Sequence, residues 1–155
     1  MNEKFMREAI RLSIQKMRRG QGGPFGALVV RNGRIVGRGW NQVTSANDPT
    51  AHAEVVAIRE ACRRLKTFQL DDCDLYTSCE PCPMCLSAIY WARLRNVFYG
   101  NTRQDAARIN FYDDFIYREV ALPIAKRQRK LKQLLRKEAL VAFTEWEQKA
   151  DKVLY

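Results

Sequence analysis

Hydrophobic residues recur every three or four positions between residues 3 and 19, with charged residues between them. Phe5, Ala9 and Leu12 belong to this apolar set, which is typical of a helix that buries one face. A glycine-rich run over 20–24 then predicts a tight turn. The run lacks the Gly-Lys-Ser/Thr ending of a phosphate-binding loop, so we assign it no nucleotide role.

A hairpin followed by alternating helices and strands is predicted over the next part of the chain. The hairpin joins 27–30 to 34–40 through Asn32-Gly33, a strong turn signal between β-branched runs. The later elements alternate in type: a helix over about 50–65 with Asp48 and Pro49 as its N-cap and first position, a strand over 74–78, a helix from Pro81 or Pro83 to about Arg93, and a strand over 97–99. This order predicts an α/β fold, a three-layer α/β/α sandwich with a mixed sheet between the helices.

The last third of the chain has weaker patterns. Residues 101–125 show no regular period, and residues 130–135 fit a strand or a helix equally well. Apolar positions over 139–146 repeat with helical spacing. Because no linker, repeat or low-complexity tract interrupts the chain, we expect one domain over residues 1–155.

The composition, 46% hydrophobic and 28% charged, is that of a globular rather than a disordered protein. The longest apolar runs, such as 27–30, are too short to span a bilayer, and the first residues lack the apolar core of a secretion signal. We therefore expect a cytoplasmic protein without membrane contact. In that compartment, five cysteines indicate a metal site or reactive thiols rather than disulfides.

The net charge of +10 has a local origin. Residues 126–137 hold seven basic and no acidic residues, which leaves 20 basic against 17 acidic residues elsewhere. Such a run is more often a solvated surface than a nucleic-acid site, so we expect no nucleic-acid partner without excluding one.

A histidine and three cysteines carry the strongest chemical signal. His52 is the only histidine, and we place it in the first turn of its helix. Cys82 and Cys85 are three positions apart at the start of another helix, so their side chains share a face and can bind one ion. Zn²⁺ selects imidazole and thiolate ligands, and three protein ligands leave the fourth tetrahedral position open.

Cys79 and Glu54 decide between an enzyme and a structural metal site. If Cys79 were the fourth ligand, the site would be closed and the protein would be a zinc-stapled binding domain. Glu54 favours the open site, because a carboxylate beside a zinc-activated water can transfer its protons. With no second histidine in the chain, that role falls to a carboxylate.

The combination of His52-x-Glu54 with Pro81-Cys82-x-x-Cys85 resembles the signature of the zinc-dependent nucleoside and nucleobase deaminases. Longer stretches resemble the bacterial guanine deaminases of the cytidine/deoxycytidylate deaminase superfamily: 22–26, 47–54, 69–73, 76–85 and 88–92. The resemblance implies a five-stranded sheet, a homodimer, one Zn²⁺ per subunit, and hydrolysis of guanine to xanthine and ammonia.

The resemblance also implies a role for each matching residue. Zinc-bound hydroxide would attack C2 of guanine, with Glu54 as the proton shuttle and Asp113 near the departing amino group. The remaining matches are the zinc ligands His52, Cys82 and Cys85, the substrate-binding residues Phe25, Asn41 and Trp91, and Tyr155, which closes the site. The segment from about 126 to 155 would complete the active site. Within this segment, Tyr155 would close the active site of the partner subunit. For Phe25 and Trp91 the sequence is equally compatible with core positions.

Two other deaminases share the signature. A tRNA-adenosine deaminase gains support from the basic run 126–137, because phosphate neutralisation dominates nucleic-acid affinity. It loses support because residues 101–117 lack the Lys- and Gly-rich stretch of those enzymes. A small-molecule cytosine or deoxycytidylate deaminase is the third possibility.

Overall fold

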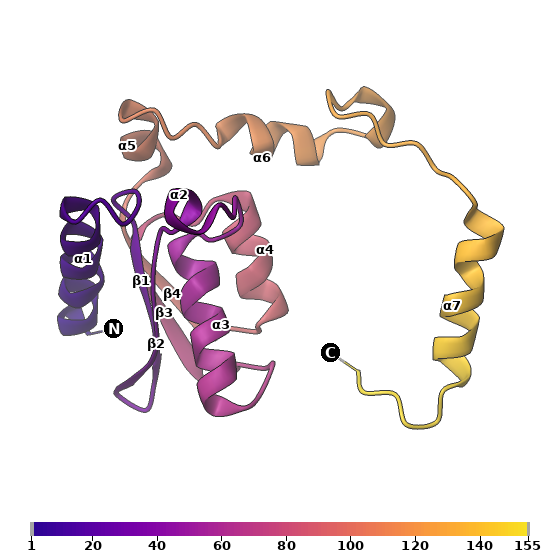
Figure 1. Ribbon diagram of the computed structural model, residues 1–155, viewed down its shortest axis with the longest axis horizontal. Helices are drawn as coiled ribbons and strands as arrows, with labels where there is room; N and C mark the ends of the chain where they lie inside the picture. Colours follow the sequence, from indigo (N-terminus) through magenta and orange to yellow (C-terminus); the bar gives the residue numbers. More distant parts are fainter. Residues whose placement is uncertain (1, 155) are drawn as a thin grey trace. The chain divides into compact units, whose positions relative to one another are not determined.

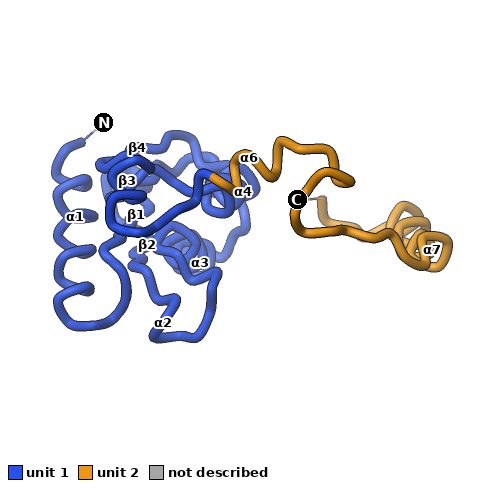
Figure 2. Tube along the Cα trace, turned by 90° about the horizontal axis from the view of Figure 1, so that it is seen from above, with its two compact units in different colours: residues 1–114 blue, residues 115–155 orange. Residues whose placement is uncertain are grey.

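The computed structural model describes residues 2–154, and the chain divides into two compact units. Unit 1 is Met1–Asp114 and unit 2 is Phe115–Tyr155, drawn in blue and orange in Figure 2. The single domain expected over residues 1–155 stays a prediction. No helix among residues 2–154 is long and apolar enough to cross a bilayer.

Unit 1 contains the sheet and its flanking helices. Its elements follow one another in this order: α1 (Glu3–Arg18), β1 (Gly26–Arg31), β2 (Arg34–Trp40), α2 (Val43–Ala46), α3 (Ala53–Leu65), β3 (Cys73–Cys79), α4 (Pro83–Trp91), β4 (Asn96–Asn101) and α5 (Arg103–Arg108). The alternation predicted from the sequence is confirmed, with α2 and α5 as short additions.

The sheet has the strand order β2-β1-β3-β4. Strand β1 pairs antiparallel with both β2 and β3, and β3 pairs in parallel with β4. The expectation of five strands is wrong for the described residues: residues 127–135, which follow η1 (Ile124–Lys126) in unit 2, form neither a strand nor a helix. Strand β4 therefore remains an open edge of this sheet.

The register brings one end of every strand to the same end of the sheet, here called the site edge to distinguish it from the open edge at β4. Gly26, at the start of β1, lies opposite Trp40 at the end of β2, and Ala27 lies opposite Thr77 near the end of β3. Cys79 ends β3 beside Asn101 at the end of β4. The loops that follow β2, β3 and β4 therefore meet at this edge, where we place the candidate site.

The two faces of the sheet are covered separately (Figure 1). Side chains alternate between the faces of a strand, so neighbouring residues of β1 enter different cores. Leu28 packs with Leu12 of α1, whereas Val29 packs with Ala57 of α3. A Cβ at Gly39 would overlap the Ala53 carbonyl oxygen, so glycine there lets α3 lie directly on β2. The mixed sheet between helices is thus confirmed.

Unit 2 consists of α6 (Asp114–Ala121), which begins at the unit boundary, η1, and α7 (Arg136–Gln148). The helix predicted over 139–146 is therefore confirmed. No residue of α6 or α7 is buried, and the exposed fractions of Leu134, Phe143 and Leu154 reach 81%, 75% and 72%. The apolar side chains of unit 2 form no core of their own.

Candidate metal and catalytic site

Both helices at the site begin one residue later than a metal ligand. His52 is the N-cap of α3, and Cys82 is the N-cap of α4, whose first position is Pro83. Both N-caps are extended, with ψ angles of 155° and 168°, so neither lies within the helical coil. The two side chains therefore project from helix ends at the same edge of the sheet.

The predicted start of α3 is wrong. Asp48 is not its N-cap, because the Asp48 carboxylate accepts hydrogen bonds from the backbone and hydroxyl of Thr50 at 2.8 and 2.6 Å. These bonds hold a local turn and leave the chain extended through His52. His52 consequently precedes the first helical turn instead of lying within it, which frees its ring to face the cysteines.

Three possible ligand atoms converge at this edge. His52 Nδ1 lies 3.5 Å from Cys82 Sγ and 3.5 Å from Cys85 Sγ, and all three atoms lie within 4.8 Å of one another. A tetrahedral Zn²⁺ with ordinary bond lengths requires a nitrogen–sulfur separation of about 3.6 Å. The three side chains therefore fit a zinc ion without rearrangement.

The two cysteine thiols differ in acidity. Hydrogen bonding from Cys85, followed by hydrogen bonding from His52, lowers the pKa of Cys82 to about 4. The hydrogen bond to Cys82 and then burial raise the pKa of Cys85. The pair therefore favours the thiolate at Cys82 over that at Cys85, and binding of a metal requires both sulfurs to lose their protons.

Cys79 lies apart from these ligands although it is close in sequence. Its thiol donates to the carbonyl oxygen of Thr102, with a sulfur–oxygen distance of 3.7 Å, and burial raises its pKa to about 11. Among the residues that the structure describes, the group able to hold a metal contains His52, Cys82 and Cys85. The geometry thus leaves the fourth tetrahedral position open.

We expect Cys79→Ser to keep full zinc occupancy and activity within about threefold of the unmodified protein, because a neutral thiol bonded to a carbonyl is no zinc ligand. Zinc content by elemental analysis and turnover are the measurements. Cys82→Ser is the contrast and should lose most of its zinc. Loss of zinc from Cys79→Ser would mean that the site is closed and structural.

Glu54 and Asp113 supply carboxylates next to the ligands. Glu54 is buried, and its two oxygens accept hydrogen bonds from Thr77 at 3.1 Å and Cys85 at 3.4 Å. Burial raises the pKa of Glu54, and burial also raises the pKa of Asp113. The charge of Asp113 acts on both His52 and Cys79, which places it at the same edge.

Asn41 and two aromatic rings lie at the same edge, where β1 begins and β2 ends. The backbone amide of Asn41 donates to the Phe25 carbonyl at 3.1 Å. The Phe25 ring meets the Phe111 ring edge-on, with centroids 4.8 Å apart. Phe111 is a site residue that the sequence analysis does not single out; its position two residues before Asp113 is the signal that would have found it.

One further predicted site residue, Trp91, is not brought to the ligands. Trp91 is the last residue of α4 and 69% exposed, whereas Cys82 caps the opposite end of that helix, about 13 Å away along its axis. Tyr155 lies outside the described residues. Their roles stay predictions.

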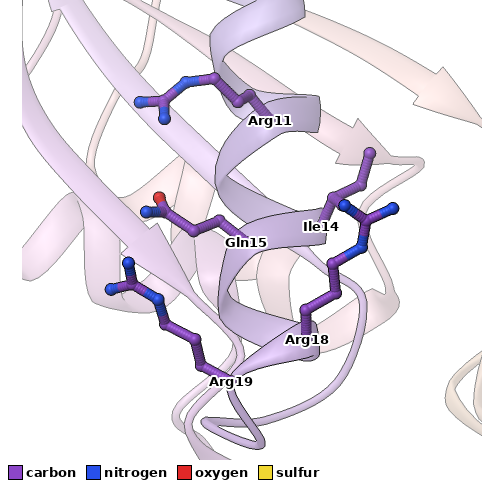
Figure 3. A pocket seen from close by; sticks show the side chains of 5 residues that line it. All are labelled: Arg11, Ile14, Gln15, Arg18 and Arg19. Atoms are coloured by element: carbon purple, nitrogen blue, oxygen red, sulfur yellow. The ribbon is translucent and has the colours of Figure 1, made fainter.

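A hollow of about 310 Å³ lies elsewhere, on the outer surface of α1 (Figure 3). It is lined by Arg11, Ile14, Gln15, Arg18 and Arg19. Arg11 is held there by a two-pronged ion pair with Glu8. None of the lining residues is a metal ligand or a nucleophile, so this hollow is separate from the chemistry at the sheet edge.

Known proteins of one family resemble this chain in sequence and in fold. Residues 1–101 match the cytidine and deoxycytidylate deaminase zinc-binding region. Guanine deaminase of Bacillus subtilis (strain 168) is 51% identical over 99% of this chain and 99% of its own length. Its X-ray structure covers 100% of this chain and 99% of that chain with a TM-score of 0.96.

More distant relatives cover less of the chain. The structure of guanine deaminase from Nitrosomonas europaea is 30% identical, covers 73% of this chain and 65% of that chain, and has a TM-score of 0.69. The tRNA-specific adenosine deaminase of Aquifex aeolicus (strain VF5) is 42% identical over 63% of this chain and 64% of its own length.

Proposed function

The chain belongs to the cytidine and deoxycytidylate deaminase family, and we propose that it is a zinc-dependent guanine deaminase that hydrolyses guanine to xanthine and ammonia. The observation that carries this function is the 51% identity to the Bacillus subtilis guanine deaminase over 99% of both chains. The similarity to the Aquifex aeolicus tRNA-specific adenosine deaminase stops at 63% of this chain. The identity to a guanine deaminase therefore spans nearly the whole chain, unit 2 included, whereas the similarity to this tRNA enzyme covers less than two thirds of it.

The residues at the sheet edge suit this reaction. When bound by His52, Cys82 and Cys85, Zn²⁺ supplies a Lewis acid that makes water a nucleophile at neutral pH. Glu54 would accept one proton as the water adds to C2 of guanine and pass it to a ring nitrogen; it would then take the second proton from the added hydroxyl group and deliver it to the departing amino group, which leaves as ammonia. Its burial supports this role, because a carboxyl group in an apolar site can hold a proton near neutral pH.

Three further side chains hold and release the base in this proposal. Asn41 orients the purine through hydrogen bonds, and the Phe25 ring packs against it. Asp113 lies near the amino group as it leaves, and the effect of its charge on the pKa of His52 supports that placement. Buried polar contacts of this kind discriminate strongly between bases, because a mismatched base leaves them unpaired.

We also propose that the protein is a homodimer in which unit 2 completes the active site of the partner subunit. Two observations support this. The apolar residues of unit 2 are exposed, among them Leu134, Phe143 and Leu154. In addition, β4 is an open sheet edge, where Tyr99 is 51% exposed and a further strand can add. A second copy of the chain would cover both surfaces.

The five cysteines of the chain support a cytoplasmic location in this proposal. All of them are free of disulfide bonds, including Cys62, Cys73 and Cys79, which lie outside the group able to hold a metal. Thiols of this kind persist in a reducing compartment and tend to pair in an oxidising one.

Ammonia release tests the function directly. With zinc-loaded protein, we expect turnover of guanine at least about 100-fold above that of adenine or cytosine, because the site pairs the polar edges of one base. Transfer RNA should release no inosine on digestion. Inertness toward guanine together with inosine formation in transfer RNA would overturn the proposal in favour of a tRNA-adenosine deaminase. Cytosine turnover alone would indicate a pyrimidine enzyme.

A further inference from the structure

We infer that the Gly22-Gly23 turn fixes the side-chain amide of Asn41 before substrate arrives, so that Asn41 is a hydrogen-bond donor only. Its NH₂ group then selects a base that presents an acceptor at that position. The identity of the base rests on the proposed function, whereas the orientation of the amide rests on contacts within unit 1.

Two backbone amides determine the orientation of the Asn41 side chain. The oxygen Oδ1 accepts from the backbone N–H of Gly23 at 3.4 Å and from the backbone N–H of Val43 at 3.3 Å. Both neighbours are donors, and an NH₂ group cannot accept from either of them. A flipped amide would leave two backbone N–H groups facing a third donor, so the oxygen must lie on this side.

The nitrogen of the same amide remains available. Asn41 Nδ2 donates to no described residue, although Asn41 as a whole is only 6% exposed. The one side-chain atom in residues 2–154 that is unpaired and sealed from water is Trp40 Nε1. Nδ2 is therefore not fully sealed from solvent, and it is the atom of this amide left free to donate to a ligand.

Gly22 is what allows this arrangement. Its φ is +142°, a conformation that residues with a side chain rarely adopt. A Cβ there would overlap the carbonyl oxygen of Asn41 and lie 2.8 Å from its carbonyl carbon. Any side chain at residue 22 would push the Asn41 backbone away from the turn. Gly22 is thus a positioning residue for Asn41.

Gly23 sets the surroundings of the amide. A Cβ at Gly23 would lie 3.4 Å from both the Phe111 and the Phe25 rings and 3.6 Å from Asn41 Cγ. The two rings and the amide therefore all lie beside the same residue of the turn. A planar base that packs on the rings would bring its edge to Nδ2.

Guanine carries its acceptors at N3, O6 and N7, and its donors at N1, N9 and the 2-amino group. A donor-only Asn41 pairs with one of these acceptors. An analogue that replaces that atom with C–H loses the bond, and the buried N–H is left unpaired.

The experiment compares guanine with 7-deazaguanine and 2-aminopurine, which lack N7 and O6 respectively; N3 is kept, because it takes up a proton when water adds to C2. In the unmodified zinc enzyme, we expect kcat/KM to fall about 10- to 100-fold on losing the atom that pairs with Asn41. In Asn41→Ala, that analogue and guanine should be turned over with kcat/KM values within about threefold of each other, because no bond remains to lose. Unchanged discrimination in Asn41→Ala against both analogues would overturn the inference.

The Asn41→Asp variant tests whether residue 41 must donate a hydrogen bond to the base or whether any polar contact is enough. One carboxylate oxygen can still accept from Gly23 and Val43, and the other places an acceptor where Nδ2 was. We expect kcat/KM for guanine to fall at least as far in Asn41→Asp as in Asn41→Ala, with zinc retained. Turnover by Asn41→Asp near the unmodified value would show that no donor is needed.

Gly22→Ala and Gly20→Ala test the turn itself. Gly20 lies in the same run with a φ of +66°, but a Cβ there meets nothing within 4 Å. Gly22→Ala should lose discrimination between guanine and the pairing analogue, whereas Gly20→Ala should keep it. If Gly22→Ala does not fold, the Asn41 comparison decides alone. Absence of guanine turnover in the unmodified enzyme would defeat the proposed function, and turnover with Asn41-independent discrimination defeats this inference only.

Discussion

Replacement of Glu54 by glutamine should leave zinc bound and lower the turnover of guanine by about 10²- to 10⁴-fold. Glutamine has the size of glutamate and keeps an oxygen that can accept from Thr77, which bonds to Glu54 at 3.1 Å. It cannot take up or release a proton near neutral pH. The loss should therefore appear in kcat, with the affinity for guanine changed far less.

The matched control for this variant is Glu60→Gln. Glu60 lies on the same helix α3, and its carboxylate accepts from the backbone of Arg38 at 2.7 Å, away from the metal ligands. Zinc content and melting temperature should be similar in the two variants, while only Glu54→Gln loses turnover. Full activity in Glu54→Gln would remove Glu54 from the mechanism. Loss of zinc in the same variant would assign it to the metal instead.

The sequence predicted those parts of the fold that local chemistry determines. The hairpin follows from Asn32-Gly33, both of which adopt positive φ in the turn, at 49° and 71°. The start of α4 follows from Pro83, which fits the first helical position because it has no N–H to leave unpaired. In both cases, one or two residues carry the whole signal.

Prediction failed where two local signals competed. Asp48 followed by Pro49 is a good helix start, yet the Asp48 carboxylate bonds to Thr50 and begins a turn. The start of α3 is set by tertiary packing, because Gly39 brings the Ala53 carbonyl onto β2. No local pattern reports a contact between residues 14 positions apart.

The fifth strand could not be derived from this chain alone. Residues 130–135 alternate too weakly to specify a strand, and in the structure they adopt no regular element. An isolated edge segment gains its hydrogen bonds only when a neighbouring strand is present. If that neighbouring strand belongs to a second copy of the chain, the fifth strand forms only in the dimer. Neither the sequence pattern nor the contacts within one chain can then predict it.

If the tail closes the active site as proposed, removal of residues 149–155 should lower guanine turnover by about 100-fold while zinc stays bound, because water would then reach the reacting base. The deletion starts after Gln148, the last residue of α7, so the helix remains complete. Val153 and Leu154 are 61% and 72% exposed in the single chain, so their loss should leave the fold of unit 1 and its metal-binding residues intact. Zinc content, melting temperature and turnover are measured together.

Mixing this truncated chain with full-length Glu54→Gln shows whose tail closes which site. Each variant alone should be nearly inactive. If unit 2 serves the partner, a heterodimer has one complete site, made of Glu54 in the truncated chain and the tail of the other chain. Random assembly at equal amounts then restores about a quarter of the normal activity per site, since half of the dimers are mixed and half of their sites are complete. If each tail closes its own site, no complete site can form and the mixture stays inactive.

The same mixture at concentrations low enough to dissociate dimers should lose its activity, because the two halves of the site are then on separate chains.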